Sequence, residues 1–230
     1  MLSSGQHGFA QLTAPLEISG SSARALHDQA ILWQYAYRKH LPRGYETEAL
    51  EALSHFPELR NVPIRMRIRK SYATLKTRPT LWGMFMPRGH RSYVITISDK
   101  TISTLKPLLF AHLPEAARVG IIGHELSHVL DFSRKSSWNC LVTALDHASP
   151  SFVDSLEFNT DKICIQHGLG KDLEAWSLYI RQTMHTKYWR GADYVRHTDT
   201  HYERYMNPET IEKYMRESPA QGVPPIKSAY

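Results

Sequence analysis

Residues 114–134 read PEAARVGIIGHELSHVLDFSR, and this stretch decides the fold. Proline suits the first position of a helix and an acidic residue suits its first turn, so Pro114 and Glu115 predict a helix start. The helix is expected to end near residues 133–137. Apolar residues recur along it at helical spacing and predict a face turned to the core: Val119, Ile122, Leu126, Val129 and Leu130.

The same helix carries the pattern HExxH, from His124 to His128. Two histidines four residues apart lie about 40° apart around a helix and roughly one turn apart along it, so both imidazoles can reach one ion. Zinc lowers the pKa of a bound water towards about 7, and Glu125 is placed to take its proton during attack on a carbonyl. We therefore expect His124 and His128 to bind metal and Glu125 to act as general base. The plain alternative is a core helix with two hydrogen-bonded histidines.

A catalytic zinc site needs a third protein ligand. A metzincin would have glycine and histidine three and six residues after His128, but those positions hold an aspartate and an arginine. Glu157 and Asp161 lie four residues apart on the next expected helix, which makes Glu157 the expected ligand. Asp161 is then placed to bind the far nitrogen of a ligand histidine. His147, in an expected loop, is the competing ligand, and a solvated acidic pair is the other explanation of the two carboxylates.

The remaining segments predict an α+β fold. Three short segments are strand-like and predict a small, mostly antiparallel sheet: 64–70, 80–86 and 91–98. A turn at 87–90 would join the last two. Further helices are expected on both sides of these strands, at about 21–40, 46–56, 151–167, 172–186 and 209–216.

The length of 230 residues suits one domain with a sizeable core. We expect it to comprise an N-terminal helical part (1–60), a catalytic core (61–186) and a C-terminal part rich in histidine and tyrosine (187–230). No signal peptide or bilayer-spanning stretch is visible, so we expect a soluble chain and leave its compartment open. Cys140 and Cys164 are too few for a disulfide scaffold, and we favour two thiols over one bridge.

The net charge of +6 and pI near 9.3 are explained by a mildly basic surface. The densest basic run lies at residues 65–70, and within it apolar and basic residues alternate strictly from Ile64 to Arg69. Such alternation predicts one strand with a buried face and a solvated cationic face. We therefore do not expect a nucleic-acid partner.

Residues 91–172 resemble the gluzincins, zinc peptidases in which HExxH is followed on a second helix by ExxxD. The likeness is to the soluble catalytic core of the CAAX-protease-type family and to the minigluzincins. It rests on YVITI at 93–97, LPEAA at 113–117, GHELSH at 123–128, EFNTD at 157–161, and glycines 168 and 170 at the end of the second helix.

This resemblance implies a zincin-like fold in which a sheet packs on the HExxH helix and the glutamate helix follows. It implies Glu125 as general base and Asp161 as the hydrogen-bond partner of a ligand histidine. It also implies that the site binds one zinc ion through His124, His128 and Glu157.

The resemblance further implies an exposed edge strand that binds an extended peptide by main-chain pairing. In this chain that strand would lie between Arg91 and Ser98. Two features depart from the CAAX-type members. Their membrane-spanning helices are missing, and Asn207-Pro208 stands where they tend to have His-Pro. The substrates of those members therefore do not carry over.

Peptide hydrolysis also needs a hydrogen-bond donor for the oxyanion that forms on the attacked carbonyl. Residues 185–205 are dense in histidine and tyrosine, and we expect His201 and Tyr202 to supply it. Packing of an aromatic interface explains the same residues equally well. The other candidates in this segment are His185, Tyr188, Tyr194, His197 and Tyr205.

Taken together, these features predict a zinc-dependent endopeptidase that acts on a peptide or protein substrate. One alternative is a zinc-binding scaffold or regulator of the same fold without proteolytic activity. Another is a DNA-associated metalloprotease of the SprT-like kind, which the basic pI and His147 favour. The lack of a zinc ribbon, and of a basic cluster with interleaved aromatic residues, speaks against it.

Overall fold

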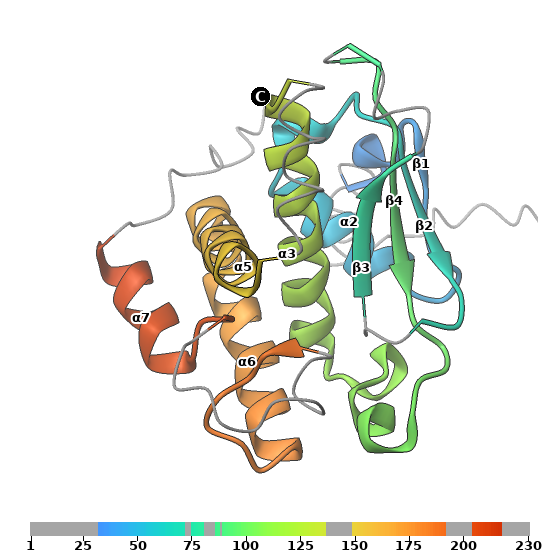
Figure 1. The fold of residues 1–230 in the computed structure, drawn as a ribbon. Helices are drawn as coiled ribbons and strands as arrows, with labels where there is room; N and C mark the ends of the chain where they lie inside the picture. Colours follow the sequence, from blue (N-terminus) through green and yellow to red (C-terminus); the bar gives the residue numbers. More distant parts are fainter. Residues whose placement is uncertain are drawn as a thin grey trace, which may run out of the picture.

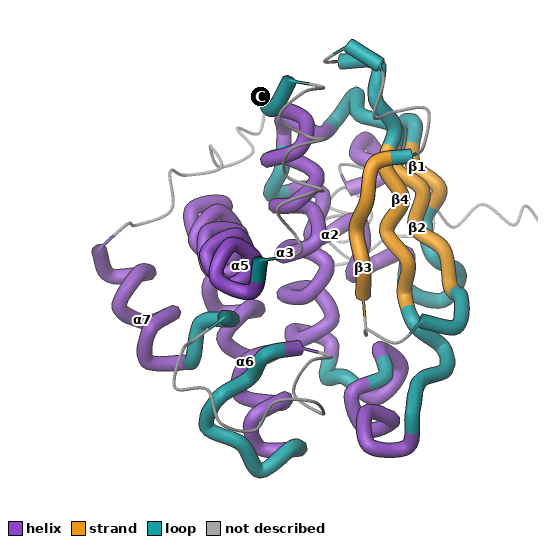
Figure 2. Tube along the Cα trace, viewed as in Figure 1, coloured by secondary structure: helices purple, strands orange, loops and turns teal. Residues whose placement is uncertain are grey.

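A four-stranded sheet and a group of helices form two layers in the computed structural model of the chain (Figure 1). The structure describes residues 32–71, 75–80, 86–87, 89–136, 149–191 and 204–217. Figure 2 shows the strands on one side of helix α3 and the later helices on the other. The expected α+β class is confirmed.

The sheet has the strand order β1-β2-β4-β3, and most of its pairings are parallel. Strands β1 (Lys39–His40), β2 (Ile64–Ile68) and β4 (Tyr93–Ile97) run parallel, and only β3 (Leu75–Pro79) is antiparallel, to β4. The prediction of a mostly antiparallel sheet is therefore wrong. Parallel neighbours need a crossover connection, and α2 (Glu46–Ser54) with the short helix η2 (Pro57–Leu59) supplies it between β1 and β2.

The edge strand beside the helices is β3, not the segment between Arg91 and Ser98. That prediction is wrong because β4 pairs with β2 on one side and β3 on the other, and all five of its residues are buried. The strand expected at 80–86 lies earlier, at β3, and residues 81–85 are outside the described part of the chain. The turn at 87–90 is present, since the His90 N–H donates to the Pro87 carbonyl at 3.2 Å.

The helix expected to continue to residue 40 ends earlier. Its end is the short helix η1 (Gln34–Ala36), after which Arg38 adopts a left-handed φ of 58° and the chain enters β1. The Lys39 ammonium group stabilises this turn by donating to three carbonyl oxygens at 3.0 Å, those of Tyr37, Leu59 and Arg60. The apolar spacing that predicted a helix to residue 40 carries no information about these contacts, which join segments distant in sequence. Residues 1–31 lie outside the described part.

Helix α3 (Glu115–Arg134) is central to the domain and carries the HExxH motif. Every residue from 119 to 130 is buried, because the sheet and α2 cover one side of α3 and later helices cover the other (Figure 1). Between β4 and α3 the chain forms two short helices, η4 (Ser103–Leu108) and η5 (Phe110–His112). The expected start of α3 near Pro114 is confirmed.

The later helices pack against α3 or against one another, and all three were expected from the sequence. They are α5 (Pro150–Cys164), α6 (Gly170–Thr183) and α7 (Pro208–Glu217). A π-helical turn, η6 (Ile165–Leu169), separates α5 from α6, and Gly168 there has a left-handed φ of 85° that favours glycine. Asn207 begins α7, since its side-chain oxygen accepts from the Thr210 N–H at 2.8 Å.

Two glycines on α3 allow this close packing. A Cβ atom at Gly120 would overlap the main chain of Asp172 at the start of α6, and one at Gly123 would overlap the side chain of Leu169. Cys164, a buried free thiol, also lies beside Gly123. Cys140 lies outside the described residues. Among the described helices, none is both long and apolar enough to cross a membrane.

Candidate metal centre

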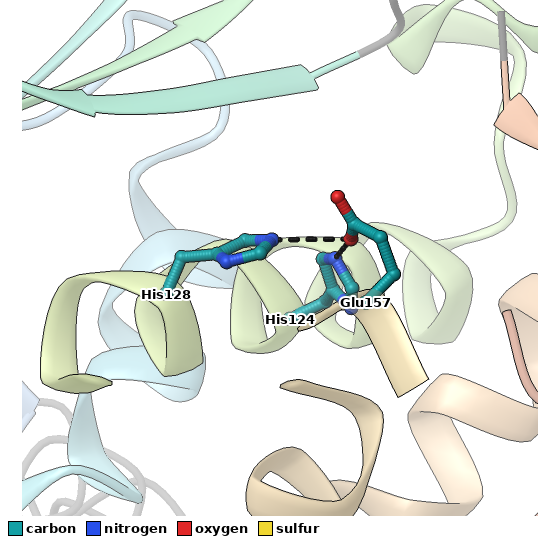
Figure 3. A group of neighbouring side chains, drawn as sticks. All are labelled: His124, His128 and Glu157. Atoms are coloured by element: carbon teal, nitrogen blue, oxygen red, sulfur yellow. Dashed lines mark hydrogen bonds and ion pairs between the residues drawn. The ribbon is translucent and has the colours of Figure 1, made fainter. Parts of the chain in front are cut away.

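Three side chains from two helices meet at one point (Figure 3). His124 and His128 come from α3 and Glu157 from α5, and one ligand atom from each lies within 4.8 Å of the others. The Glu157 oxygen Oε2 lies 3.0 Å from Nε2 of His124 and 3.2 Å from Nε2 of His128. Both imidazoles are buried and Glu157 is partly buried. The structure thus brings together the three residues expected to bind metal.

Asp161 holds the far side of the His124 ring. The Nδ1–H of His124 donates to Oδ1 of Asp161 at 2.7 Å, and the other carboxylate oxygen accepts from the Met206 N–H at 2.8 Å. The carboxylate therefore fixes the imidazole tautomer that leaves Nε2 facing Glu157. It also joins α5 to the segment that precedes α7.

Thr160 holds His128 in the same way. Its hydroxyl hydrogen is donated to the Leu156 carbonyl at 2.8 Å, so the hydroxyl oxygen accepts from the Nδ1–H of His128 at 3.2 Å. Nε2 of His128 is then the nitrogen that faces Glu157. Both histidines consequently have one ring nitrogen occupied by an outer partner and the other directed at the same carboxylate.

The charges of this cluster favour a cation. Burial acts to lower the pKa of His124, but its hydrogen bonds to Asp161 and Glu157 outweigh burial and raise that pKa well above its ordinary value. Burial likewise acts to raise the pKa of Glu157, and the adjacent His128 and His124 outweigh it and lower that pKa. The raised pKa keeps His124 protonated against the two carboxylates. A divalent cation that displaced the proton would leave neutral imidazoles and balance the charge of the carboxylates.

Glu125 lies one residue beyond His124, at the point where α3 passes the edge strand. Its side chain is buried, and its carbonyl accepts from the Thr77 hydroxyl of β3 at 3.4 Å. The main chain of α3 at the candidate general base therefore contacts β3, the strand at the edge of the described sheet.

Aromatic rings form a wall beside His124. The centroid of the Tyr205 ring lies 5.6 Å from that of His124, and the centroid of Trp176, on α6, lies 6.0 Å away. Burial raises the pKa of the Tyr205 hydroxyl well above its usual value, and the charges of Glu157 and Glu125 add to this effect. The Tyr205 hydroxyl therefore stays protonated and able to donate a hydrogen bond.

An ion-pair network fixes Arg204, the residue before Tyr205. Arg190 donates from one nitrogen to both carboxylate oxygens of Asp154 at 2.9 Å, and Arg204 donates to the same carboxylate at 2.7 Å. Arg204 also donates to the Arg190 carbonyl at 3.2 Å. Asp154 thereby ties α5 to the residue that immediately precedes Tyr205.

Some expected site residues cannot be placed against this centre. His201 and Tyr202, expected as oxyanion donors, and His147, the competing metal ligand, lie outside the described residues. Tyr205 was one of the seven candidates in the C-terminal segment, but nothing in the sequence distinguished it from the others. Thr160 was missed, although it lies three residues after Glu157 and so on the same helix face.

Comparisons of the chain with protein-family models, with curated proteins and with solved structures found no match. The arrangement of the side chains is therefore the evidence for the nature of the site. It shows a buried group of two histidines and one glutamate that could hold a metal ion, consistent with a zincin-like site.

Proposed function

We propose that this chain is a zinc-dependent endopeptidase of the gluzincin type, with one zinc ion bound by His124, His128 and Glu157. The observation that carries the proposal is the shared direction of the two imidazoles. Each has its Nδ1 occupied, by Asp161 or Thr160, and each directs Nε2 at the Glu157 carboxylate. Two histidines and one carboxylate form the protein ligand set of many catalytic zinc sites.

A bound zinc ion would supply Lewis acidity, which polarises a carbonyl and lowers the pKa of coordinated water towards about 7. In this proposal Glu125 takes a proton from the attacking water and passes it to the leaving amine. Tyr205 donates a hydrogen bond to the oxygen on which negative charge develops. Asp161 and Thr160 orient the two histidines.

We propose that the substrate is an extended peptide that pairs with the edge of β3, which has no further neighbouring strand among the described residues. The strand is short, its inner neighbour β4 is fully paired, and α3 runs beside it with Glu125. Main-chain pairing would bring a peptide bond of the substrate to the buried cluster without requiring a particular side-chain sequence.

Zinc content and peptidase activity, measured on the same preparations, test this proposal. We expect about one zinc per chain in the wild type and in a Glu217→Gln control, which removes one partner of an exposed ion pair with Lys213 on α7. We expect far less zinc in Glu157→Gln. The wild type should cleave fluorescein-labelled casein, and chelation should stop cleavage.

Two outcomes would contradict parts of the proposal. Equal zinc in Glu157→Gln and the control would remove Glu157 from the ligand set. A full zinc complement without cleavage of casein or of unstructured peptides would favour the non-proteolytic scaffold and remove the peptidase assignment.

A further inference from the structure

The outer face of the sheet, turned away from α3, carries an ordered group of cations. Along β2, Ile64 and Met66 are buried, whereas Arg65 is exposed and Arg67 half-buried. Side chains alternate between the two faces of a strand, so both arginines lie on the outer face. No described helix packs against this face (Figure 1).

Strand β3 contributes two more cations to the same face. Leu75 is buried and Thr77 bonds to the Glu125 carbonyl, which places both on the side of α3. Lys76, which is exposed, and Arg78, which is half-buried, therefore lie on the outer face. The sequence alone does not predict this strand, so the joining of two basic strands becomes visible only in the structure.

The register of the sheet aligns these cations in two rows across β4. Arg65 and Arg78 flank Val94, and Arg67 and Lys76 flank Thr96. From the usual strand spacings, the cations lie roughly 10 Å apart across β4 and roughly 7 Å apart along each strand. We call Arg65, Arg67, Lys76 and Arg78 the basic face.

No carboxylate neutralises the basic face within the described part of the chain. The outward positions of the four strands hold no aspartate or glutamate, and His40 adds a further basic side chain beside Arg65. Two of its arginines donate hydrogen bonds to uncharged acceptors: Arg67 to the Thr96 hydroxyl at 3.2 Å, and Arg78 to the Pro79 carbonyl at 3.5 Å. The charges of the face are thus left to attract an anionic partner.

A cavity of about 400 Å³ continues the basic face at the start of the parallel strands. Arg65 belongs to both the basic face and the cavity lining, and Val94, which Arg65 and Arg78 flank, also lines the cavity. The polar residues of the lining are basic or hydroxylic, and none is acidic: Arg38, Lys39, His40, Arg65, Thr80, Ser92 and Tyr93. This lining could therefore accept one phosphate group of an anionic partner bound on the basic face.

We propose that the basic face binds duplex nucleic acid through its phosphodiester backbone, without regard to sequence. Three of the four cations are arginines, whose planar fork matches a phosphate. The spacing of roughly 7 Å along each strand is similar to two base-pair steps of about 3.4 Å, and the spacing of roughly 10 Å across β4 lies between the minor-groove and major-groove widths of about 6 and about 12 Å. Apart from the imidazole of His40, no aromatic ring occupies an outward position of the described strands, so this face offers bases little to stack on, and a duplex fits better than a single strand.

A membrane surface fits the basic face less well. Peripheral membrane binding usually combines cations with apolar side chains that enter the lipid. The only apolar residue at an outward position of the described strands is Val94, which is buried. The pI near 9.3 and the clustering of cations on one face agree with a nucleic-acid partner.

The test is fluorescence anisotropy with a labelled 20-base-pair DNA duplex of random sequence and the full chain. We compare the wild type with the double variant Arg65→Gln/Arg78→Gln. The matched control is Lys213→Gln/Arg216→Gln on α7, which removes the same charge from exposed positions on the opposite side of the molecule (Figure 1). Thermal unfolding checks that the double variant is folded. If it is not, Lys76→Gln, a single change at an exposed position, replaces it in the binding assay.

We expect the wild type to bind the duplex with a Kd on the order of 10⁻⁴ to 10⁻⁶ M at physiological salt. The double variant should bind at least about tenfold more weakly, Lys76→Gln about threefold more weakly, and the control within about twofold of the wild type. Absence of duplex binding by the wild type would overturn the proposal, as would equal losses in the double variant and the control. Binding to phosphatidylserine vesicles but not to the duplex would also overturn it, in favour of a membrane.

This inference does not depend on the metal centre. The experiment requires neither zinc nor peptidase activity, so its failure would leave the proposed function untouched. Conversely, loss of the peptidase assignment would leave the basic face as a nucleic-acid surface.

Discussion

The metal centre and the basic face lie on opposite sides of the same sheet and differ in how their charges are satisfied. At the metal centre, each histidine meets an acceptor and two carboxylates are held at fixed distances in a buried site. On the basic face, four cations lie towards solvent and no described carboxylate pairs with them. A buried charge needs partners within the fold, whereas water stabilises an exposed cation, which therefore remains available to an anionic binding partner.

The two regions also differ in how the sequence encodes them. The metal centre depends on two i, i+4 spacings within helices, which are visible in the sequence. The basic face depends on the register of three strands, which the sequence alone does not disclose. Variants that affect one region and spare the other therefore test whether the two are independent.

Glu125→Gln should give the largest difference between the two regions, a loss of peptidase activity without a loss of duplex binding. Loss of a general base costs about 10²- to 10⁴-fold in rate, so casein cleavage should fall by that range, while zinc content stays near one per chain. Duplex binding should not change, because Glu125 lies on the other side of the sheet from the basic face. Cleavage near the wild-type rate would remove Glu125 from the role of base.

Added salt should weaken duplex binding at the basic face and leave zinc binding at the metal centre almost unchanged. If four phosphates are neutralised, duplex affinity should fall roughly 100-fold between 50 and 200 mM salt, with a slope of log K against log salt of about −3.6. Zinc binding at a buried site is screened much less and should change little. Anisotropy titrations and competition with a zinc-binding dye measure the two effects, and a flat salt profile for the duplex would contradict phosphate contacts.

Asp161→Asn should weaken zinc binding by about 10- to 100-fold, because the amide cannot hold His124 as a carboxylate does. Competition with a chelator of known affinity gives the value. The Glu217→Gln variant, which removes an exposed carboxylate, should bind zinc as the wild type does. An Asp161→Asn protein with wild-type zinc affinity would show that this contact does not orient the ligand.

Thr160→Val should have the smallest effect on zinc, an affinity loss of about tenfold or less. Valine matches threonine in shape but cannot accept from Nδ1 of His128, so only one neutral hydrogen bond to the ring is lost. The same chelator competition measures it. A loss larger than that of Asp161→Asn would reverse the ranking of the two outer partners.

The helices that carry the centre were predictable because their signals are local. Pro114 and Glu115 set the start of α3, and the spacing of Glu157 and Asp161 places both on one face of α5. Thr160 was predictable in principle from the same helix face. Tyr205 was not, because its position depends on the ion pairs of Asp154 with Arg190 and Arg204, which join distant segments.

The sheet was harder to predict, for a physical reason. Strand β3 reads LKTRP, which has a single buried apolar residue and ends in a proline that suits an edge strand. Its composition gives no strand signal, so the strand was expected several residues later. Without β3 in place, the parallel pairing of β1, β2 and β4 and the edge beside Glu125 could not be derived.

Anomalous X-ray scattering at the zinc edge, from crystals of the zinc-loaded protein, tests the proposed ligand set without relying on activity. We expect one peak, about 2.0–2.1 Å from Nε2 of His124 and of His128 and about 2.0–2.2 Å from a carboxylate oxygen of Glu157. A peak bound by other residues, or no peak between α3 and α5, would contradict it.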